Sequence, residues 1–162
     1  MAKNRFSESH GILGLTVDGD WNAGFDSDSV DMSKYNHCCM IIIGDASVAG
    51  AAILTLYGGA TAGTKTAAAT FTYRYAGAAV GSASSDVFGA AATSAALTST
   101  PATIANYVML IEFEAADLMI SNTQYRYATL NVSAAGTAGT CDIVAVMSEP
   151  RYAEAIMDTA QA

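Results

Sequence analysis

The sequence predicts an all-β protein, an antiparallel β-sandwich with jelly-roll-like connections and about seven or eight short strands. Three observations support this prediction. Apolar-rich segments of five to nine residues recur along the chain, glycine-rich connections separate them, and no long stretch has the spacing of an amphipathic helix. This combination is typical of two antiparallel sheets packed face to face.

The chain of 162 residues is long enough for one domain with its own core, and no charged or proline-rich linker divides it. We expect a single sandwich domain over 1–162, with an N-terminal arm at 1–11 and a C-terminal tail at 150–162. The first strand is predicted over Ile12–Val17, because an apolar segment there is followed by the turn residues Asp18 and Gly19.

An acidic segment follows from Asp18 to Asp31, with five carboxylates and no base. Oxygen-bearing side chains at alternate positions from Asp18 to Asn22 resemble the start of a calcium loop. The later positions do not fit, since Ala23 replaces the glycine of the sharp turn and Ser29 replaces the closing glutamate. We therefore expect a solvated acidic loop, and the sequence leaves open whether it binds a cation.

Two aromatic residues, Trp21 and Phe25, lie within this polar segment. Aromatic side chains in such a position either cover the edge of the core or anchor a contact with a partner. Both functions are kept as alternatives, and covering the core is the commoner one.

The segment Tyr35–Ile43 is predicted to be the central strand. Its last six residues, Cys38–Ile43, are apolar at every position, so both faces of the strand would be buried. Such a strand lies inside a sheet packed on both sides or at an interface with another chain. Adjacent Cys38 and Cys39 would point to opposite faces, and His37 is expected to be a hydrogen-bonded structural residue.

Two strands are predicted next, over Ala52–Tyr57 and Thr70–Tyr75. The second one alternates and places Phe71, Tyr73 and Tyr75 on one face. An aromatic row of this kind packs in a core or forms a flat platform for a sugar or a nucleobase, and core packing is the commoner case.

The segment Ala76–Ala105 is low in complexity and rich in Ala, Gly, Ser and Thr. We predict a long loop with a short strand near Val87 and Phe88, while a helix around Ala90–Leu97 is a weaker alternative because threonine, serine and nearby glycines disfavour it. Loops this long are usually functional or ordered by a partner.

The remaining strands are predicted over Asn106–Glu114, Tyr125–Val132 and Thr140–Ser148, followed by a tail that either forms a short helix or extends to a neighbouring molecule. Glu112 and Glu114 lie on one face of their strand, as a glycosidase pair could. Because no second acid group is visible opposite them, they are interpreted as surface residues.

Charge and cysteine content narrow the function classes. Seven basic residues are scattered among fifteen acidic ones, giving a net charge of −8, which argues against partners such as nucleic acid or an anionic membrane. Three cysteines and no apolar leader favour synthesis in a cytosol without disulfides. With no Cys-x-x-Cys pair and no nucleophile, base and orienting group, we expect no metal, no cofactor and no enzymatic activity.

Sheet edges exposed to solvent are normally protected by lysine or proline, and this chain has only one lysine beyond residue 34. We therefore expect another subunit to cover at least one edge or face, which makes a homo-oligomer the working hypothesis.

Three segments together resemble the head decoration, or cement, proteins of tailed bacteriophages: VDMSKYNHCCMIIIGDAS at Val30–Ser47, YVMLIEFEAADL at Tyr107–Leu118 and MSEPRYA at Met147–Ala153. The resemblance implies a β-rich, often jelly-roll protein that binds as a homotrimer to the outside of the capsid. Its partner would be the major capsid protein, its location the outer surface of the virion, and its role to stabilise contacts between capsid subunits after synthesis in the host cytoplasm. The resemblance implies no catalytic residue.

Candidate partner-binding residues are the two aromatics of the acidic segment, two apolar residues of the long loop and two residues after the last strand: Trp21, Phe25, Val87, Phe88, Arg151 and Tyr152. Alternative functions are another head or tail component of a phage, or a jelly-roll carbohydrate-binding module. The second alternative would use Tyr73, Tyr75, Trp21 or Tyr125 as its sugar platform.

Overall fold

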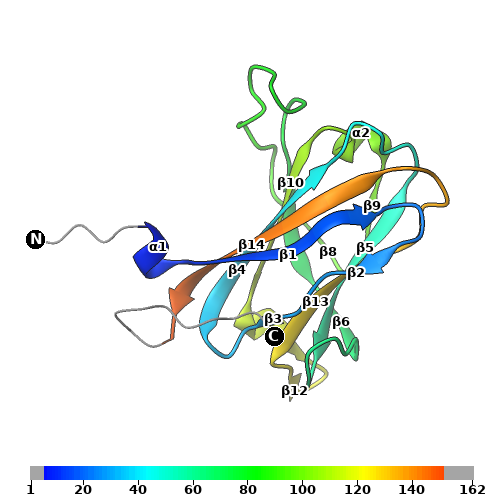
Figure 1. Ribbon diagram of the computed structural model, residues 1–162. Coiled ribbons are helices and arrows are strands. Elements are labelled where there is room, and N and C mark those ends of the chain that lie inside the picture. The colour runs from blue at the N-terminus through cyan, green and yellow to red at the C-terminus, as the bar shows by residue number, and fades with distance from the viewer. Residues whose placement is uncertain (1–5, 152–162) are drawn as a thin grey trace, which may run out of the picture.

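The computed structural model describes residues 6–151 and shows two antiparallel six-stranded sheets packed as a sandwich (Figure 1). Sheet A contains, in spatial order, β1 (Gly11–Asp20), β14 (Thr140–Pro150), β4 (Tyr35–Gly44), β10 (Val108–Glu114), β7 (Phe71–Tyr75) and β8 (Ala92–Ser94). Sheet B contains β2 (Phe25–Asp26), β13 (Tyr127–Val132), β5 (Ala52–Gly59) and β6 (Ala67–Ala69), with β3 (Val30–Asp31) on β13 and β9 (Leu97–Ser99) on β5. The predicted fold class is confirmed.

The chain crosses repeatedly between the two sheets, so that β1, β4, β10 and β14 alternate with strands of sheet B in a jelly-roll-like order. A separate hairpin pairs β11 (Met119–Ile120) with β12 (Thr123–Gln124). Helical turns are limited to α1 (Phe6–Ser9), α2 (Pro101–Ile104) and the 3-10 turn η1 (Ala115–Leu118) in the described residues.

The predicted number of strands is too low, since the described residues contain 14. Seven of these have five or more residues and correspond to the predicted segments, while the other seven have only two or three. Strands this short show no recognisable alternation of apolar and polar residues, because a period of two residues needs about four residues to appear.

The core lies between the sheets and is formed by alternate residues of the long strands. In β4, Cys38, Met40 and Ile42 are fully buried, whereas Cys39 and Ile41 are half-buried and Ile43 is exposed. The strand is central, with β14 and β10 on its two sides, as predicted. Of the two alternatives for its second face, burial inside a sheet packed on both sides is wrong, since only one face of sheet A packs against sheet B, and an interface with another chain stays a prediction.

The low-complexity segment differs from its prediction. Val87 and Phe88 form no strand, only one bridge from Phe88 to Ala76, and Ala90–Leu97 forms no helix. The end of this segment forms two short strands instead. β8 pairs with β7 and β9 pairs with β5, because both of these neighbouring strands offer free backbone groups for pairing. The residues between β7 and β8 protrude as a loop (Figure 1).

Within the predicted arm at 1–11, Phe6–Ser9 is helical, the ring of Phe6 stacks on His10 with centroids 4.0 Å apart, and Gly11 pairs with Met147, while residues 1–5 lie outside the described residues. The predicted helix in the C-terminal tail lies outside the described residues.

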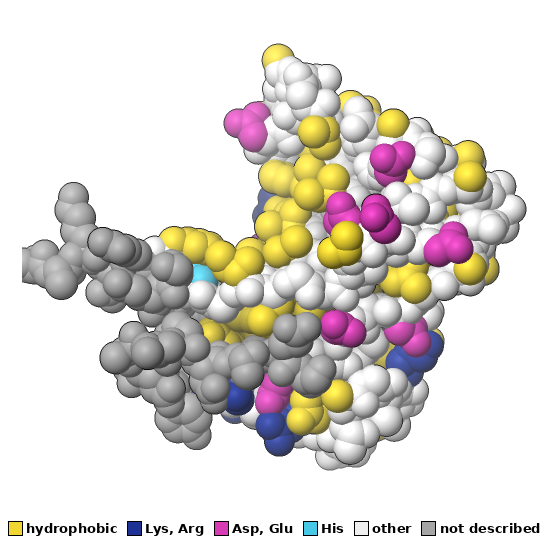
Figure 2. Space-filling model, viewed as in Figure 1, with side chains coloured by type: hydrophobic (Ala, Val, Ile, Leu, Met, Phe, Trp, Pro, Cys, Tyr) yellow, Lys and Arg dark blue, Asp and Glu magenta, His cyan; other side chains and the backbone are white. Residues whose placement is uncertain are grey.

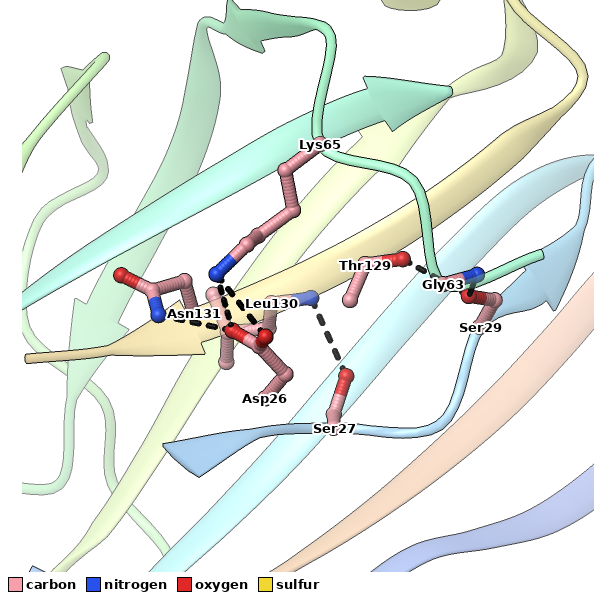
Figure 3. A network of polar contacts seen from close by, with 8 residues as sticks. All are labelled: Asp26, Ser27, Ser29, Gly63, Lys65, Thr129, Leu130 and Asn131. Atoms are coloured by element: carbon pink, nitrogen blue, oxygen red, sulfur yellow. Dashed lines mark hydrogen bonds and ion pairs between the residues drawn. The ribbon is translucent and has the colours of Figure 1, made fainter. Parts of the chain in front are cut away.

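The acidic segment is solvated as predicted at Asp18, Asp20, Asp26 and Asp28, which are exposed, but it is not a loop throughout, since β1 extends to Asp20 and β2 and β3 lie within it. Trp21 is fully buried and its Nε1 donates to the Gly50 carbonyl at 2.9 Å. Asp26 accepts hydrogen bonds from Lys65 and Asn131, at 2.8 and 2.7 Å (Figure 3). The acidic segment has no basic residue of its own, and Lys65, which pairs with Asp26, lies far from it in the sequence. The sequence of the segment could therefore not indicate this contact.

A polar network lies along β13 in sheet B (Figure 3). Buried Ser29 and Thr129 share a hydrogen bond of 2.7 Å, and the Gly63 N–H donates to Ser29 Oγ at 2.8 Å, which fixes the 60–66 segment. The part of sheet B around β13 therefore has its polar groups hydrogen-bonded within the chain.

Candidate functional site

The outer face of sheet A carries a continuous set of apolar side chains, which we call the apolar face. Cross-strand pairs place Val144, Ile41 and Leu110 in one row, because Ile41 is opposite Val144 on one side and Leu110 on the other. The same pairing aligns Ile43 with Val108. The eight members are Ile12, Cys39, Ile41, Ile43, Val108, Leu110, Val144 and Val146.

These side chains are accessible. Ile12 is 57% exposed and Ile43 is 39% exposed, and the other six are half-buried by their neighbours in the sheet. Figure 2 shows hydrophobic side chains gathered over β10, β4 and β14. The outer face of sheet B, in contrast, is largely polar, so the two faces of the sandwich differ in chemistry. Contiguous apolar surface of this kind marks an interaction site.

The edges of sheet A are protected by other means than lysine or proline. Edge strand β1 has two register irregularities, between Gly14 and Thr16 and between Thr16 and Gly19, and the opposite edge strand β8 has only three residues. Bulges and short edge strands both hinder pairing with another chain. The face of sheet A, and not its edge, is therefore the surface left open.

The apolar face ends in a polar groove lined by His37, Thr72, Glu112, Phe113, Glu114 and Asp117. His37 Nδ1 lies 2.8 Å from Ser148 Oγ, which supports its predicted structural function. The Glu114 N–H donates to Asp117 Oδ2 at 2.8 Å. Glu112 is half-buried and Glu114 is exposed, so both lie at the surface as predicted.

Cys39 belongs to the apolar face and behaves there as an apolar side chain. Burial, with a smaller effect of nearby Glu112, raises the pKa of its thiol to about 11. Burial also raises the pKa of Cys141 to about 12 and that of Cys38 well above its usual range. All three are free thiols, protonated at neutral pH.

The structure does not assemble the predicted partner-binding residues into one surface. Trp21 is fully buried and Phe25 packs on the core from sheet B, so both residues cover the core, the commoner of the two predicted alternatives. Val87 is 59% exposed and Phe88 half-buried on the loop after β7, and Arg151 is exposed after β14. Tyr152 lies outside the described residues.

The aromatic row of β7 faces the core and forms no platform. Phe71 is buried, and the rings of Tyr73 and Tyr75 pack edge to face with centroids 5.5 Å apart against the core. Core packing is therefore the correct alternative for these three residues. Tyr125 is also partly buried against the core.

The apolar face was not predicted from the sequence, although the segments that form it are recognisably apolar on both strand faces. Cys38–Ile43, Val108 with Leu110, and the middle of Thr140–Ser148 are apolar on both strand faces. That excess of apolar residues indicated a second buried surface, but only the strand order places the three segments side by side.

No family model, curated protein or solved structure was found to match this chain. In residues 6–151, no group of three or more His, Cys, Asp or Glu is placed to hold a metal ion. The described helices are all too short to cross a membrane.

Proposed function

We propose that this protein is a structural component of a tailed-phage virion, which binds the outside of the capsid and stabilises contacts between major capsid subunits. The observation that carries the proposal is the apolar face of sheet A, because an open apolar sheet face on a protein of net charge −8 is suited to binding another protein. The resemblance of three segments to head decoration proteins supplies the identity of the partner.

Two further features support a capsid exterior. The acidic charge is poorly suited to contact with packaged DNA, since phosphate binding needs clustered cations. The rigid sandwich, with a core built from both sheets, can bear load between neighbouring subunits. A carbohydrate-binding module has less support, because Trp21 is buried and Tyr73 and Tyr75 face the core.

Co-sedimentation with capsids tests the proposal. The purified chain is mixed with expanded empty capsids assembled from the phage's major capsid protein, whose gene we expect to lie beside the gene of this chain. Saturable binding is the expected result. Absence of co-sedimentation, together with saturable binding to a glycan array, would overturn the proposal in favour of the carbohydrate-binding alternative.

A further inference from the structure

We propose that the apolar face binds a protein segment that carries a lysine or arginine beside its apolar side chains, and that this base enters the polar groove and pairs with Glu112. The inference deepens the proposed function and rests on it only in treating this face as a protein-binding surface. It adds the chemistry of the partner and the direction in which the partner lies on the sheet.

Glu112 borders the apolar face on two sides. Along β10 it follows Leu110 on the same outward side, since Ile111 between them is fully buried in the core. Across the sheet its partner on β4 is Cys39, a member of the apolar face, and its partner on β7 is Thr72. An occupant that covers Leu110 and Cys39 therefore covers Glu112 as well.

The carboxylate of Glu112 has no cationic partner within the described chain. In residues 6–151, no basic side chain forms an ion pair with Glu112. Arg74 on β7 is the cross-strand partner of Leu110, but its Nη1 donates to the Gly89 carbonyl oxygen at 3.2 Å. Because Glu112 is only half-buried, solvent reaches its side chain and compensates its charge.

Covering this carboxylate has a cost that the occupant must offset. A carboxylate that loses its solvent without gaining a cation or a hydrogen-bond donor weakens a complex by more than one neighbouring apolar side chain strengthens it. An occupant that is apolar throughout is therefore disfavoured over Glu112. A lysine or arginine at this point replaces the lost solvent with charge-assisted hydrogen bonds, which are among the stronger ones in proteins.

The polar groove can receive a long basic side chain. Its volume is about 410 Å³, and Glu112, Glu114 and Asp117 contribute carboxylates to its lining. Asp117 is held in place there, because its Oδ2 accepts a hydrogen bond from the Glu114 N–H at 2.8 Å. The other ionisable residue of the lining, His37, cannot compensate three carboxylates. The electrostatics of the groove therefore favour a cation.

The position of the groove gives the partner a direction on the sheet. Glu112 and Glu114 lie near the end of β10, whereas Val108 begins this strand and is paired with Ile43 of β4. The base of the partner therefore lies at the end of β10, and its apolar side chains extend over Leu110 toward Val108.

Two other occupants fit this surface less well. A second copy of the chain brings another net charge of −8, so that the two copies repel each other. A membrane with anionic headgroups is repelled by the same net charge and by the carboxylates of the groove. A partner protein with a basic side chain is attracted by both.

Titration of the full chain followed by nuclear magnetic resonance tests the charge preference without a capsid. The probes are hexylammonium and hexanoate, which have alkyl tails of similar length and opposite charges. Hexylammonium is expected to shift the resonances of Leu110 and Thr72 saturably, and hexanoate is expected to shift neither. Glu112→Gln should weaken hexylammonium binding several-fold, and circular dichroism verifies that the variant is folded.

The matched control is Asp86→Asn, which removes the same charge from an exposed position on the loop after β7 and should leave the titration unchanged. Equal shifts with both probes, or unchanged hexylammonium binding by Glu112→Gln, would overturn the inference. Shifts of the same resonances on raising the protein concentration alone, or on adding phosphatidylcholine vesicles, would identify a second copy or a lipid as the occupant and would also overturn it.

Co-sedimentation of the same variants with capsids adds a test that depends on the sign of the effect. If a base of the partner pairs with Glu112, Glu112→Gln leaves that base unpaired and should weaken binding at least about tenfold. If the partner is apolar at this point, the variant should bind more tightly, because it removes a charge that binding desolvates. Tighter or unchanged binding would overturn the inference.

Failure of the inference and failure of the proposed function give different results. Capsid binding that Glu112→Gln strengthens or leaves unchanged overturns the inference and leaves the proposed function in place. A wild type that binds hexylammonium through Glu112 but does not bind capsids overturns the proposed function alone.

Discussion

Arg126 and Asp31 lie 95 residues apart in the sequence and form a two-pronged ion pair, in which Arg126 Nε donates to Asp31 Oδ1 at 2.9 Å and Nη2 donates to Oδ2. The pair joins the end of the acidic segment to the start of β13. The Asp31 side chain is 7% exposed, so its charge is held in the protein and not in open solvent.

This ion pair makes stability depend on pH. Burial alone would raise the pKa of Asp31, but hydrogen bonds from Arg126 and Ser33 outweigh burial and lower the pKa from 3.8 to about 2. Because the folded pKa is lower than the unfolded one, the stabilisation is complete above about pH 5 and is lost as the pH falls from about 4 through 2.

Asp31→Asn should therefore reduce the free energy of unfolding at pH 7 by at most about 2 kcal/mol, because the substitution removes the stabilisation that accompanies the lowered pKa of Asp31. The difference from the wild type should disappear near pH 2. Urea denaturation at a series of pH values measures it, with exposed Asp86→Asn as the control. A difference that is the same at pH 7 and pH 2 would contradict the prediction.

Adjacent residues of β4 should respond oppositely to the same substitution. Ile42 is fully buried between the sheets, so Ile42→Asp places an unpaired charge in the core and should cost more than about 4 kcal/mol. Ile43 faces outward, so Ile43→Asp should cost about 1 kcal/mol or less in the monomer. Thermal unfolding followed by circular dichroism compares the two, and an unchanged melting temperature for Ile42→Asp would show that the assigned faces are wrong.

Gly44 is expected to tolerate no side chain, because an added Cβ would collide with the backbone carbonyl oxygen of Ile104. Backbone cannot move aside as a flexible side chain can, so Gly44→Ala should reduce stability by about 2 kcal/mol. The control is Gly14→Ala, since no atom lies within 4 Å of the added Cβ there. Equal chemical-denaturation midpoints for the two variants would argue against this packing.

The three thiols should be unreactive in the folded protein. With the pKa of Cys39 raised to about 11, roughly one thousandth of it is thiolate at pH 8, and Cys38 and Cys141 are buried. Ellman's reagent should therefore label no cysteine rapidly under native conditions and three after denaturation. Rapid native labelling of one thiol would indicate that Cys39 is more open than the structure shows.

Several features were predictable from the sequence because they depend on neighbours along the chain. Alternation of side chains predicted β7 and the common face of Phe71, Tyr73 and Tyr75, and the unbroken apolar segment Cys38–Ile43 predicted the central position of β4. The predicted turn at Asp18 and Gly19 was wrong, because these residues lie at a register irregularity inside β1, which continues to Asp20. The short strands were not predictable, since two or three residues carry no period.

The amino-acid sequence by itself determined that this chain forms a sandwich and that some of its strands are apolar on both faces. Only the tertiary structure decided what the second face does. Strand order aligned Ile41 with Val144 and Leu110, segments distant in the sequence, and left their common face open. Folding likewise brought Lys65 and Arg126 to an acidic segment without bases of its own. Contacts between distant segments depend on sheet register, which no local pattern of residues encodes.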